Sequence, residues 1–238
     1  MKELVKISNL TMRFGKKTVL TDVNISIKEG EIYGIVGNNG AGKTTLLKLV
    51  CGLLKPVSGS IIFGDSVKPP IIGTLIESPG LYFDMSAYEN IKAKSLCMGI
   101  KYTKGQIEDL LSVVGLDNVR KKSVRTFSMG MKQRLAIAIA LVGDPELLIL
   151  DEPINGLDPQ GINDIRNLVL KIHKERNVSI IISSHILGEL AKIATRFCVI
   201  NKGRVIKECS KDEFVSECGE KDINEYYLEI INNSVSNW

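Results

Sequence analysis

The most informative stretch of the chain is a glycine-rich loop that reads Gly37-Asn38-Asn39-Gly40-Ala41-Gly42-Lys43-Thr44-Thr45. It fits the pattern G-x-x-x-x-G-K-[ST], in which glycines allow successive backbone N–H groups to turn inward around an anion. In this pattern the lysine reaches the β- and γ-phosphates of a nucleotide, and the next hydroxyl binds Mg²⁺. We therefore expect residues 37–45 to bind a nucleotide, with Lys43 on the phosphates and Thr44 on the metal.

The segments on either side of the loop support this interpretation. Residues 32–36 form a continuous apolar run, typical of a strand that is buried on both faces. Residues 46–50 predict a helix, whose positive N-terminal dipole would stabilise bound phosphate. A chance glycine-rich turn would not require a strand before it and a helix after it.

Three further apolar runs end in polar residues that can carry chemistry. The runs are 71–76, 147–150 and 180–182, and the residues that follow them are Glu77, Asp151, Glu152 and His185. The alternation of such runs with helical patterns predicts an α/β fold with mainly parallel strands. Because ligands gather at the carboxyl ends of parallel strands, we expect these polar groups at one edge of the sheet.

Two parts of the chain depart from this alternation. Residues from about 80 to 145 contain two capping-box patterns, Ser86-x-x-Glu89 and Thr103-x-x-Gln106, which predict a helical insertion. The first thirty residues alternate apolar and polar positions, which predicts an antiparallel strand layer.

The C-terminal part predicts a hairpin and a short helix. Residues 196–206 contain two apolar runs around Asn201-Lys202-Gly203, a turn sequence. Ser210-x-x-Glu213 then predicts a helix start. The polar residues after Ile231 predict a loose tail.

Asp151 and Glu152 form an acidic pair at the end of an apolar run. Asp151 can hold Mg²⁺, directly or through water, as the acidic residue that complements a phosphate loop. Glu152 points differently and can polarise an attacking water. By itself the pair could equally be a strand end that leads into a polar turn at Pro153.

Residues 127–134 (Phe-Ser-Met-Gly-Met-Lys-Gln-Arg) precede another helical pattern. Ser128 is a natural N-cap, so a structural role explains it well. A helix N-terminus with a serine and a glycine can also bind phosphate. The residues themselves leave both roles open.

Taken in chain order, these segments resemble the motifs of ABC-type ATPases. Residues 37–45 resemble Walker A, 128–133 the signature, 147–152 Walker B, 155–158 the D-loop, and His185 the switch histidine. The resemblance covers about residues 3–215, and the chain is similar to the nucleotide-binding subunit of a bacterial ABC transporter. It implies a P-loop NTPase core of mainly parallel strands over residues 1–215, with an N-terminal antiparallel β layer, a helical insertion at about 80–145 and a short tail over 216–238.

The resemblance implies ATP and Mg²⁺ as ligands and a dimer as the active form. Two such subunits, identical or homologous, trap two ATP molecules head to tail, and the Walker A loop of one faces Ser128 and Gly130 of the other. Asp158 matches the D-loop acid that crosses this interface. It also precedes Pro159, so capping the next helix is an equally good and compatible role.

Two single residues acquire roles only through the resemblance. Phe14 matches the position where an aromatic ring stacks on adenine, although a half-buried strand phenylalanine is the alternative. His185 is similar to the residue that contacts the γ-phosphate and the attacking water. An isolated histidine after a strand would otherwise suggest a structural role.

Two departures from the family pattern matter. Glu77 stands where the family usually has Gln, and Ser128-Met129-Gly130 stands where it usually has Ser-Gly-Gly. Glu77 could still reach Mg²⁺ and water, with one more negative charge beside the phosphates. Residues 72–79 and 87–90, together with this signature, resemble the subunits of bacitracin and lantibiotic export or immunity systems.

Composition excludes several classes of protein. The chain has 238 residues, 44% of them hydrophobic, and a net charge of +4. It is too apolar for a disordered protein, and its charge is too small and dispersed to indicate a nucleic-acid partner. No apolar run approaches the length of about 18 residues that a membrane span needs. The N-terminus has no apolar signal core, so we expect a cytoplasmic location.

The resemblance leads to one main hypothesis and one alternative. The main hypothesis is an ATPase on the inner face of the cell membrane that powers a separate permease, exporting an antimicrobial peptide, drug or lipid-like substrate. The permease is expected to touch the helical insertion and the segment after Glu77. The alternative is an ABC ATPase of a soluble assembly complex that does not transport.

Overall fold

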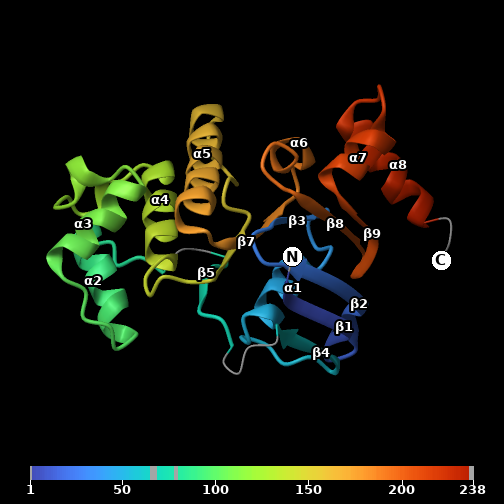
Figure 1. Cartoon of the computed structure of the whole chain (residues 1–238), viewed down its shortest axis with the longest axis horizontal. Coiled ribbons are helices and arrows are strands. Elements are labelled where there is room, and N and C mark those ends of the chain that lie inside the picture. The colour runs from blue at the N-terminus through green and yellow to red at the C-terminus, as the bar shows by residue number, and fades with distance from the viewer. Residues whose placement is uncertain (1, 65–68, 78–79, 236–238) are drawn as a thin grey trace. The chain divides into compact units, whose positions relative to one another are not determined.

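The computed structural model of the chain describes residues 2–64, 69–77 and 80–235 (Figure 1). It consists of two compact units. The first contains Met1–Pro69 and Ser179–Trp238, and the second contains Pro70–Val178. Residues 72–79 resemble bacitracin and lantibiotic export or immunity subunits, and the last two of them, Ser78 and Pro79, lie outside the described residues.

An antiparallel sheet forms one layer of the first unit. β1 (Glu3–Phe14) pairs with β2 (Lys17–Lys28) on one side and with β4 (Ser58–Phe63) on the other. Alternate apolar side chains of β1 and β2 are buried, as the period of two in the sequence predicts. The prediction of an antiparallel layer is confirmed.

The remaining strands of the first unit are mostly parallel. β3 (Ile32–Val36) lies between β7 (Ser179–Ser184) and β8 (Arg196–Asn201) and is parallel to both. β9 (Arg204–Ser210) completes the predicted hairpin and is antiparallel to β8. Every residue of β3 and β7 is buried, which explains their continuous apolar character. The predicted α/β class is confirmed.

The helices of the first unit follow its strands. They are α1 (Lys43–Val50), α6 (Leu187–Leu190), α7 (Lys211–Cys218) and α8 (Ile223–Val235). Ser210 caps α7 with a complete capping box, as predicted. The prediction of a loose tail after Ile231 is wrong for the described residues, because α8 continues to Val235 and Ser234 Oγ accepts a hydrogen bond from Asn201 Nδ2 at 3.1 Å.

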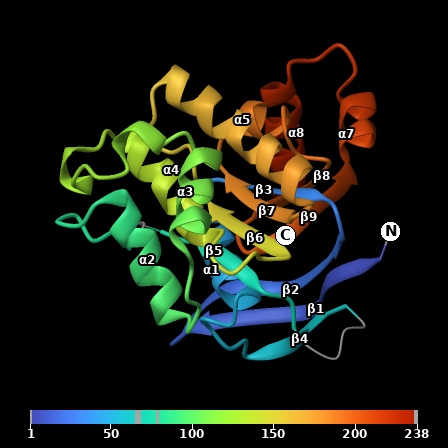
Figure 2. The ribbon, with the colours of Figure 1, turned by 60° about the vertical axis from the view of Figure 1, so that its left-hand side comes forward.

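The second unit contains the predicted helical insertion. β5 (Ile72–Leu75) and β6 (Leu147–Asp151) are parallel neighbours, and three helices lie between them in the chain: α2 (Ala87–Cys97), α3 (Lys104–Val113) and α4 (Met129–Ala140). Two 3₁₀ turns, Asp117–Val119 and Val124–Thr126, connect α3 to α4. The three helices pack against one another, and α5 (Pro159–Arg176) packs against α4 (Figure 2).

The two predicted capping boxes of the insertion are present. Ser86 opens α2 and Thr103 opens α3, each bonded reciprocally to the third helical residue, Glu89 or Gln106. These bonds satisfy the first amides of each helix from within the chain. The function of the two capping boxes is therefore structural.

No helix in the described part of the chain is long and apolar enough to cross a membrane. All five cysteines are free thiols.

Candidate nucleotide-binding and hydrolysis site

The phosphate loop joins β3 to α1, and its conformation requires glycine at two positions. A β-carbon on Gly37 would lie 2.4 Å from the backbone oxygen of Ile200. Gly42 has a φ of 109°, and a β-carbon there would lie 2.7 Å from Leu20 Cδ2. A side chain at either position would displace the loop, so the glycines of the motif are explained by close approach as well as by φ.

The start of α1 differs from that of an ordinary helix. Gly42 is its N-cap and no side chain caps it. Lys43, only 5% exposed, donates from Nζ to the backbone oxygens of Gly37 at 2.6 Å and Asn38 at 3.2 Å. The loop therefore encloses a buried positive charge beside an uncapped helix N-terminus. This combination fits the phosphates of a nucleotide, which carry negative charge and accept hydrogen bonds.

His185 belongs to the same unit as the phosphate loop and lies next to it. Val36 of β3 pairs with Ser184 of β7, so the residues that follow the paired ends are Gly37 and His185. The half-buried His185 lies between Ser184 and Ile186, and Ser184 Oγ accepts a hydrogen bond from the backbone N–H of Ile186 at 2.9 Å.

Phe14 ends β1 opposite Lys17, at the hairpin that leads into β2. Its side chain is 49% exposed. A half-exposed aromatic ring at a strand end is available to stack on a planar ligand. The same exposure fits the alternative equally well, a half-buried phenylalanine of the strand, so the stacking role stays a prediction.

In the second unit, Asp151 and Glu152 lie at the end of β6. Asp151 is the last residue of the strand and is 6% exposed. Leu150 pairs with Leu75 of β5, so Glu152 and Glu77 each come two residues after a paired position on neighbouring strands. Both have positive φ, 49° for Glu152 and 61° for Glu77. Non-glycine residues rarely adopt this conformation, and it is concentrated at functional sites.

The donor chemistry of the predicted metal ligands suits Mg²⁺. Thr44, Glu77 and Asp151 offer only hydroxyl and carboxylate oxygens, the ligands that this hard cation prefers. Among the described residues no cluster of three or more His, Cys, Asp or Glu side chains could hold a metal by itself. Mg²⁺ in nucleotide sites usually takes only one or two protein ligands and keeps phosphate and water oxygens.

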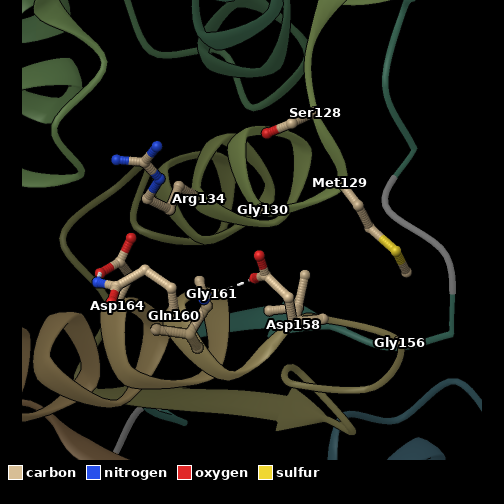
Figure 3. A pocket seen from close by; sticks show the side chains of 11 residues that line it. Ser128, Met129, Gly130, Arg134, Gly156, Asp158, Gln160, Gly161 and Asp164 are labelled. Carbon is tan, nitrogen blue, oxygen red and sulfur yellow. Dashed lines mark hydrogen bonds between the residues drawn. The ribbon is translucent and has the colours of Figure 1, made fainter.

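A pocket of about 310 Å³ brings together three of the residues predicted to face a second subunit (Figure 3). Ser128 and Gly130 come from the start of α4, and Asp158 comes from the start of α5. Ser128 Oγ accepts from the N–H of Met131 at 3.2 Å, and Asp158 Oδ1 accepts from the N–H of Gly161 at 2.8 Å. The structural roles foreseen for both caps are confirmed.

The sequence patterns did not identify the other polar residues of this pocket. Arg134, Gln160 and Asp164 also line it, and Gln160 Nε2 donates to Asp164 Oδ1 at 2.8 Å. All three lie within the first two turns of α4 or α5, but none is three or four residues from Ser128 or Asp158, so helical spacing from the caps could not have identified them.

A model of the ABC transporter family matches residues 20–155, more than half of the chain. The chain belongs to the ABC transporter ATP-binding family. Members of this family bind ATP and hydrolyse it to drive transport, so the chain is an ATP-binding ABC ATPase.

Two curated relatives are similar over most of their length. The bacitracin transport ATP-binding protein BcrA of Bacillus licheniformis is 44% identical over 236 residues, which cover 96% of this chain and 75% of the relative. The lantibiotic transport ATP-binding protein SrtF of Streptococcus pyogenes is 44% identical over 216 residues, which cover 88% of this chain and 92% of the relative.

A solved structure has the same fold. It is cbiO1 of Clostridium perfringens, part of the ABC transporter complex cbiONQ, with a TM-score of 0.80 and 31% identity over 91% of this chain and 92% of that one. The resemblance to ABC ATPases and the predicted fold class are therefore confirmed.

Proposed function

We propose that this ABC ATPase is the peripheral subunit that powers a separate membrane permease, from the inner face of the cell membrane. The observation that carries the proposal is the phosphate loop, where a buried lysine lies at a helix start that no side chain caps. Such a site is suited to bind the phosphates of ATP. The names of the two curated relatives, both transport ATP-binding proteins, support a role beside a separate permease.

In this proposal residues 37–45 hold the phosphates of ATP and Phe14 stacks on its adenine. Lys43 leaves the carbonyls of its own loop and neutralises charge on the β- and γ-phosphates. Thr44, Asp151 and Glu77 provide oxygens for Mg²⁺. The metal, when bound, stabilises the negative charge that develops on the transferred phosphoryl group.

Glu152 is the proposed catalytic base, and His185 the residue that holds the γ-phosphate and the attacking water. Glu152 would accept a proton from that water or orient it for in-line attack. Glu152 has left-handed backbone, whereas Asp151, one residue earlier, is the last residue of the strand, and this difference supports different roles for the two neighbouring acids.

The active form in this proposal is a dimer of two such cassettes. Ser128 and Gly130 then bind the γ-phosphate of ATP held by the partner, and Asp158 approaches the same interface. The pocket that joins these three residues within one subunit supports this assignment. Placed hydrogen-bond donors of this kind stabilise charge that develops in a transition state.

We further propose that residues 82–85 contact the permease. Three apolar side chains are exposed there: Tyr82 at 55%, Phe83 at 48% and Met85 at 39%. The backbone under them is fixed, because Arg125 N–H donates to the Phe83 oxygen at 2.9 Å and Val124 N–H donates to the Met85 oxygen at 3.0 Å. A rigid exposed apolar patch indicates a protein-binding surface.

The proposed substrate class is an antimicrobial peptide, which the permease would export. This part of the proposal is supported by the two curated relatives, which are named for bacitracin and lantibiotic transport and are each 44% identical to the chain.

The catalytic part of the proposal is tested by Glu152→Gln, with Glu146→Gln at the opposite end of β6 as the matched control. We expect ATP turnover to fall at least about 100-fold in Glu152→Gln, since general-base catalysis contributes a factor of this size. ATP affinity should stay unchanged, and Glu146→Gln should hydrolyse ATP normally. Unchanged turnover in Glu152→Gln would exclude its assigned role.

The permease-docking part is tested by replacing Tyr82 and Phe83 together with Ser in full-length protein expressed in its host. The control is Leu96→Ser, which removes another exposed apolar side chain from the same unit. We expect the double variant to leave the membrane fraction while its ATP affinity persists, and the control to remain membrane-bound. Wild-type protein found entirely outside the membrane fraction would favour a soluble assembly complex instead.

A further inference from the structure

Met129 occupies the signature position where the family pattern usually has glycine, and its side chain lies against Gly156 (Figure 3). A β-carbon built on Gly156 would lie 2.9 Å from Met129 Cε and 3.4 Å from its Sδ. The methionine therefore fills the space that a side chain at position 156 would occupy. Although it packs there, Met129 remains 56% exposed.

The contact joins two segments that carry proposed interface residues. Met129 directly follows the cap Ser128, and Gly156 lies two residues before the cap Asp158. Met129 and Gly156 line the same pocket as both caps. Gly156 has a φ of 74°, so the backbone of residues 153–158 turns under the methionine in a conformation that favours glycine.

We propose that Met129 is a positioning residue that makes the signature and residues 153–158 move as one body. This inference rests on the proposed function, in which both segments meet the nucleotide of a partner subunit. Phosphate bound at Ser128 and Gly130 then orders residues 153–158 through the thioether side chain. A signature with glycine in place of Met129 lacks atoms to make this contact.

Methionine suits this role because its side chain is unbranched and polarisable and adapts to an irregular surface such as a turn. The contact leaves the hydrogen bonds of the two caps intact, since both are made by other residues. Loss of the thioether would therefore uncouple the segments without removing either cap.

The same unit contains a second methionine over a glycine, which provides a matched control. A β-carbon on Gly143 would lie 3.0 Å from Met98 Cε, Gly143 has a φ of 91°, and Met98 is 39% exposed. Met98 is the C-cap of α2 and does not line the pocket of Ser128 and Asp158. Truncation of Met98 removes comparable packing from a place that has no proposed contact with nucleotide.

The experiment compares Met129→Ala, Met129→Leu and Met98→Ala in the full chain. Amide hydrogen exchange of residues 153–158 is measured without nucleotide, and steady-state ATP turnover is measured with Mg-ATP. We expect exchange at 153–158 to be at least about fivefold faster in Met129→Ala, because a local contact that restrains the turn is lost. We expect kcat to fall about tenfold with little change in KM, since misplacement of a catalytic segment affects the chemical step.

Met129→Leu should restore both values to near the wild-type level, because leucine can cover Gly156, and Met98→Ala should change neither. Unchanged exchange at residues 153–158 in Met129→Ala would overturn the proposal, and so would equal effects of Met129→Ala and Met98→Ala. Hydrogen exchange does not depend on turnover. An inactive wild-type protein would therefore contradict the proposed function while the coupling itself could still be tested.

Discussion

The starts of α1 and α4 are both proposed to bind phosphate, but they are built differently. α1 has Gly42 as its N-cap, which offers no side chain, and the buried side chain of its first residue, Lys43, reaches back to the preceding loop. α4 begins at Ser128, whose hydroxyl already accepts a backbone N–H of its own helix. α2 is a third case, with a complete capping box between Ser86 and Glu89.

The difference indicates when each helix start meets phosphate. An uncapped start with an adjacent cation gains most from a bound anion, so α1 is suited to hold ATP in the isolated subunit. A start capped by serine is satisfied without a ligand but carries no negative charge, so α4 can exchange its own cap for phosphate when a partner brings it. A capping box that includes a glutamate repels phosphate, and α2 is suited to a structural role only.

The largest expected effect is loss of nucleotide binding when the cation is removed from the α1 site. Lys43→Ala should weaken ATP binding about 100-fold, since a hydrogen bond to a charged group and the charge itself are lost. The measurement is titration of the isolated subunit with a fluorescent ATP analogue. Lys48→Gln, in the last turn of the same helix, should bind normally; equal losses in both variants would indicate general damage to α1.

Removal of the serine cap of α4 should lower ATP turnover without changing ATP affinity. Ser128→Ala should lower ATP turnover about 100-fold, as does loss of one transition-state donor in other enzymes, and leave ATP affinity of the single subunit unchanged. Ser86→Ala at α2 is the matched control. Each variant should lose about 1 kcal/mol of unfolding free energy, but only Ser128→Ala should lose turnover. Equal ATP turnover in the two variants would contradict the proposal that the start of α4 binds phosphate and the start of α2 does not.

Completion of a capping box at α4 should convert it toward the α2 type. Met131 is the third residue of α4, so Met131→Glu creates the Ser-x-x-Glu pattern. We expect a melting temperature equal to or slightly above that of the wild type. Turnover should fall about tenfold, because a carboxylate near the bound phosphate opposes its charge. Met131→Gln, which completes the box without charge, should retain most of the activity.

The smallest expected effect concerns the capping box of α7. Hydrogen bonds from the backbone and hydroxyl of Ser210 lower the pKa of Glu213. A lowered pKa in the folded state stabilises the protein above the pKa of the unfolded chain, and this stabilisation is lost as pH falls through the folded value. The melting temperature of Glu213→Gln should therefore be below that of the wild type at neutral pH, and the difference should shrink below the ordinary glutamate pKa of about 4.3.

Glu220→Gln, an exposed residue beyond α7, is the control for this pH dependence. It lies outside the capping box, so its melting temperature should be close to that of the wild type at neutral pH. A difference between Glu213→Gln and the wild type that grows on acidification would contradict a stabilising role for the ionised Glu213 carboxylate.

Much of the fold was predictable because local rules and tertiary packing agree in this chain. The apolar runs of the sequence form β3, β5, β6 and β7 in the structure, and the capping-box patterns mark the starts of α2, α3 and α7. The tail prediction failed because Ser234 accepts a hydrogen bond from Asn201, at the end of β8, and donates one to the backbone oxygen of Ile231. A bond to a residue 33 positions earlier cannot be foreseen from the polarity of the tail.

The site was predictable only in part. The phosphate loop and the end of β6 have patterns that follow directly from phosphate and metal chemistry, so Lys43 and Asp151 could be named from sequence. The positive φ of Glu77 and Glu152 and the contact of Met129 with Gly156 depend on backbone conformation and on residues distant in the chain. In the sequence, residues 82–85 have the composition of an ordinary apolar loop. Only the structure shows that three of their side chains are exposed.

The most direct test of the account is the oligomeric state of two variants in Mg-ATP, measured by sedimentation velocity. Glu152→Gln, which should bind ATP without hydrolysing it, is predicted to sediment as a dimer. Glu152→Gln combined with Ser128→Ala is predicted to bind ATP with the same affinity and to sediment as a monomer. A dimer of undiminished stability in the double variant would contradict the claim that α4 receives the phosphate of a partner subunit.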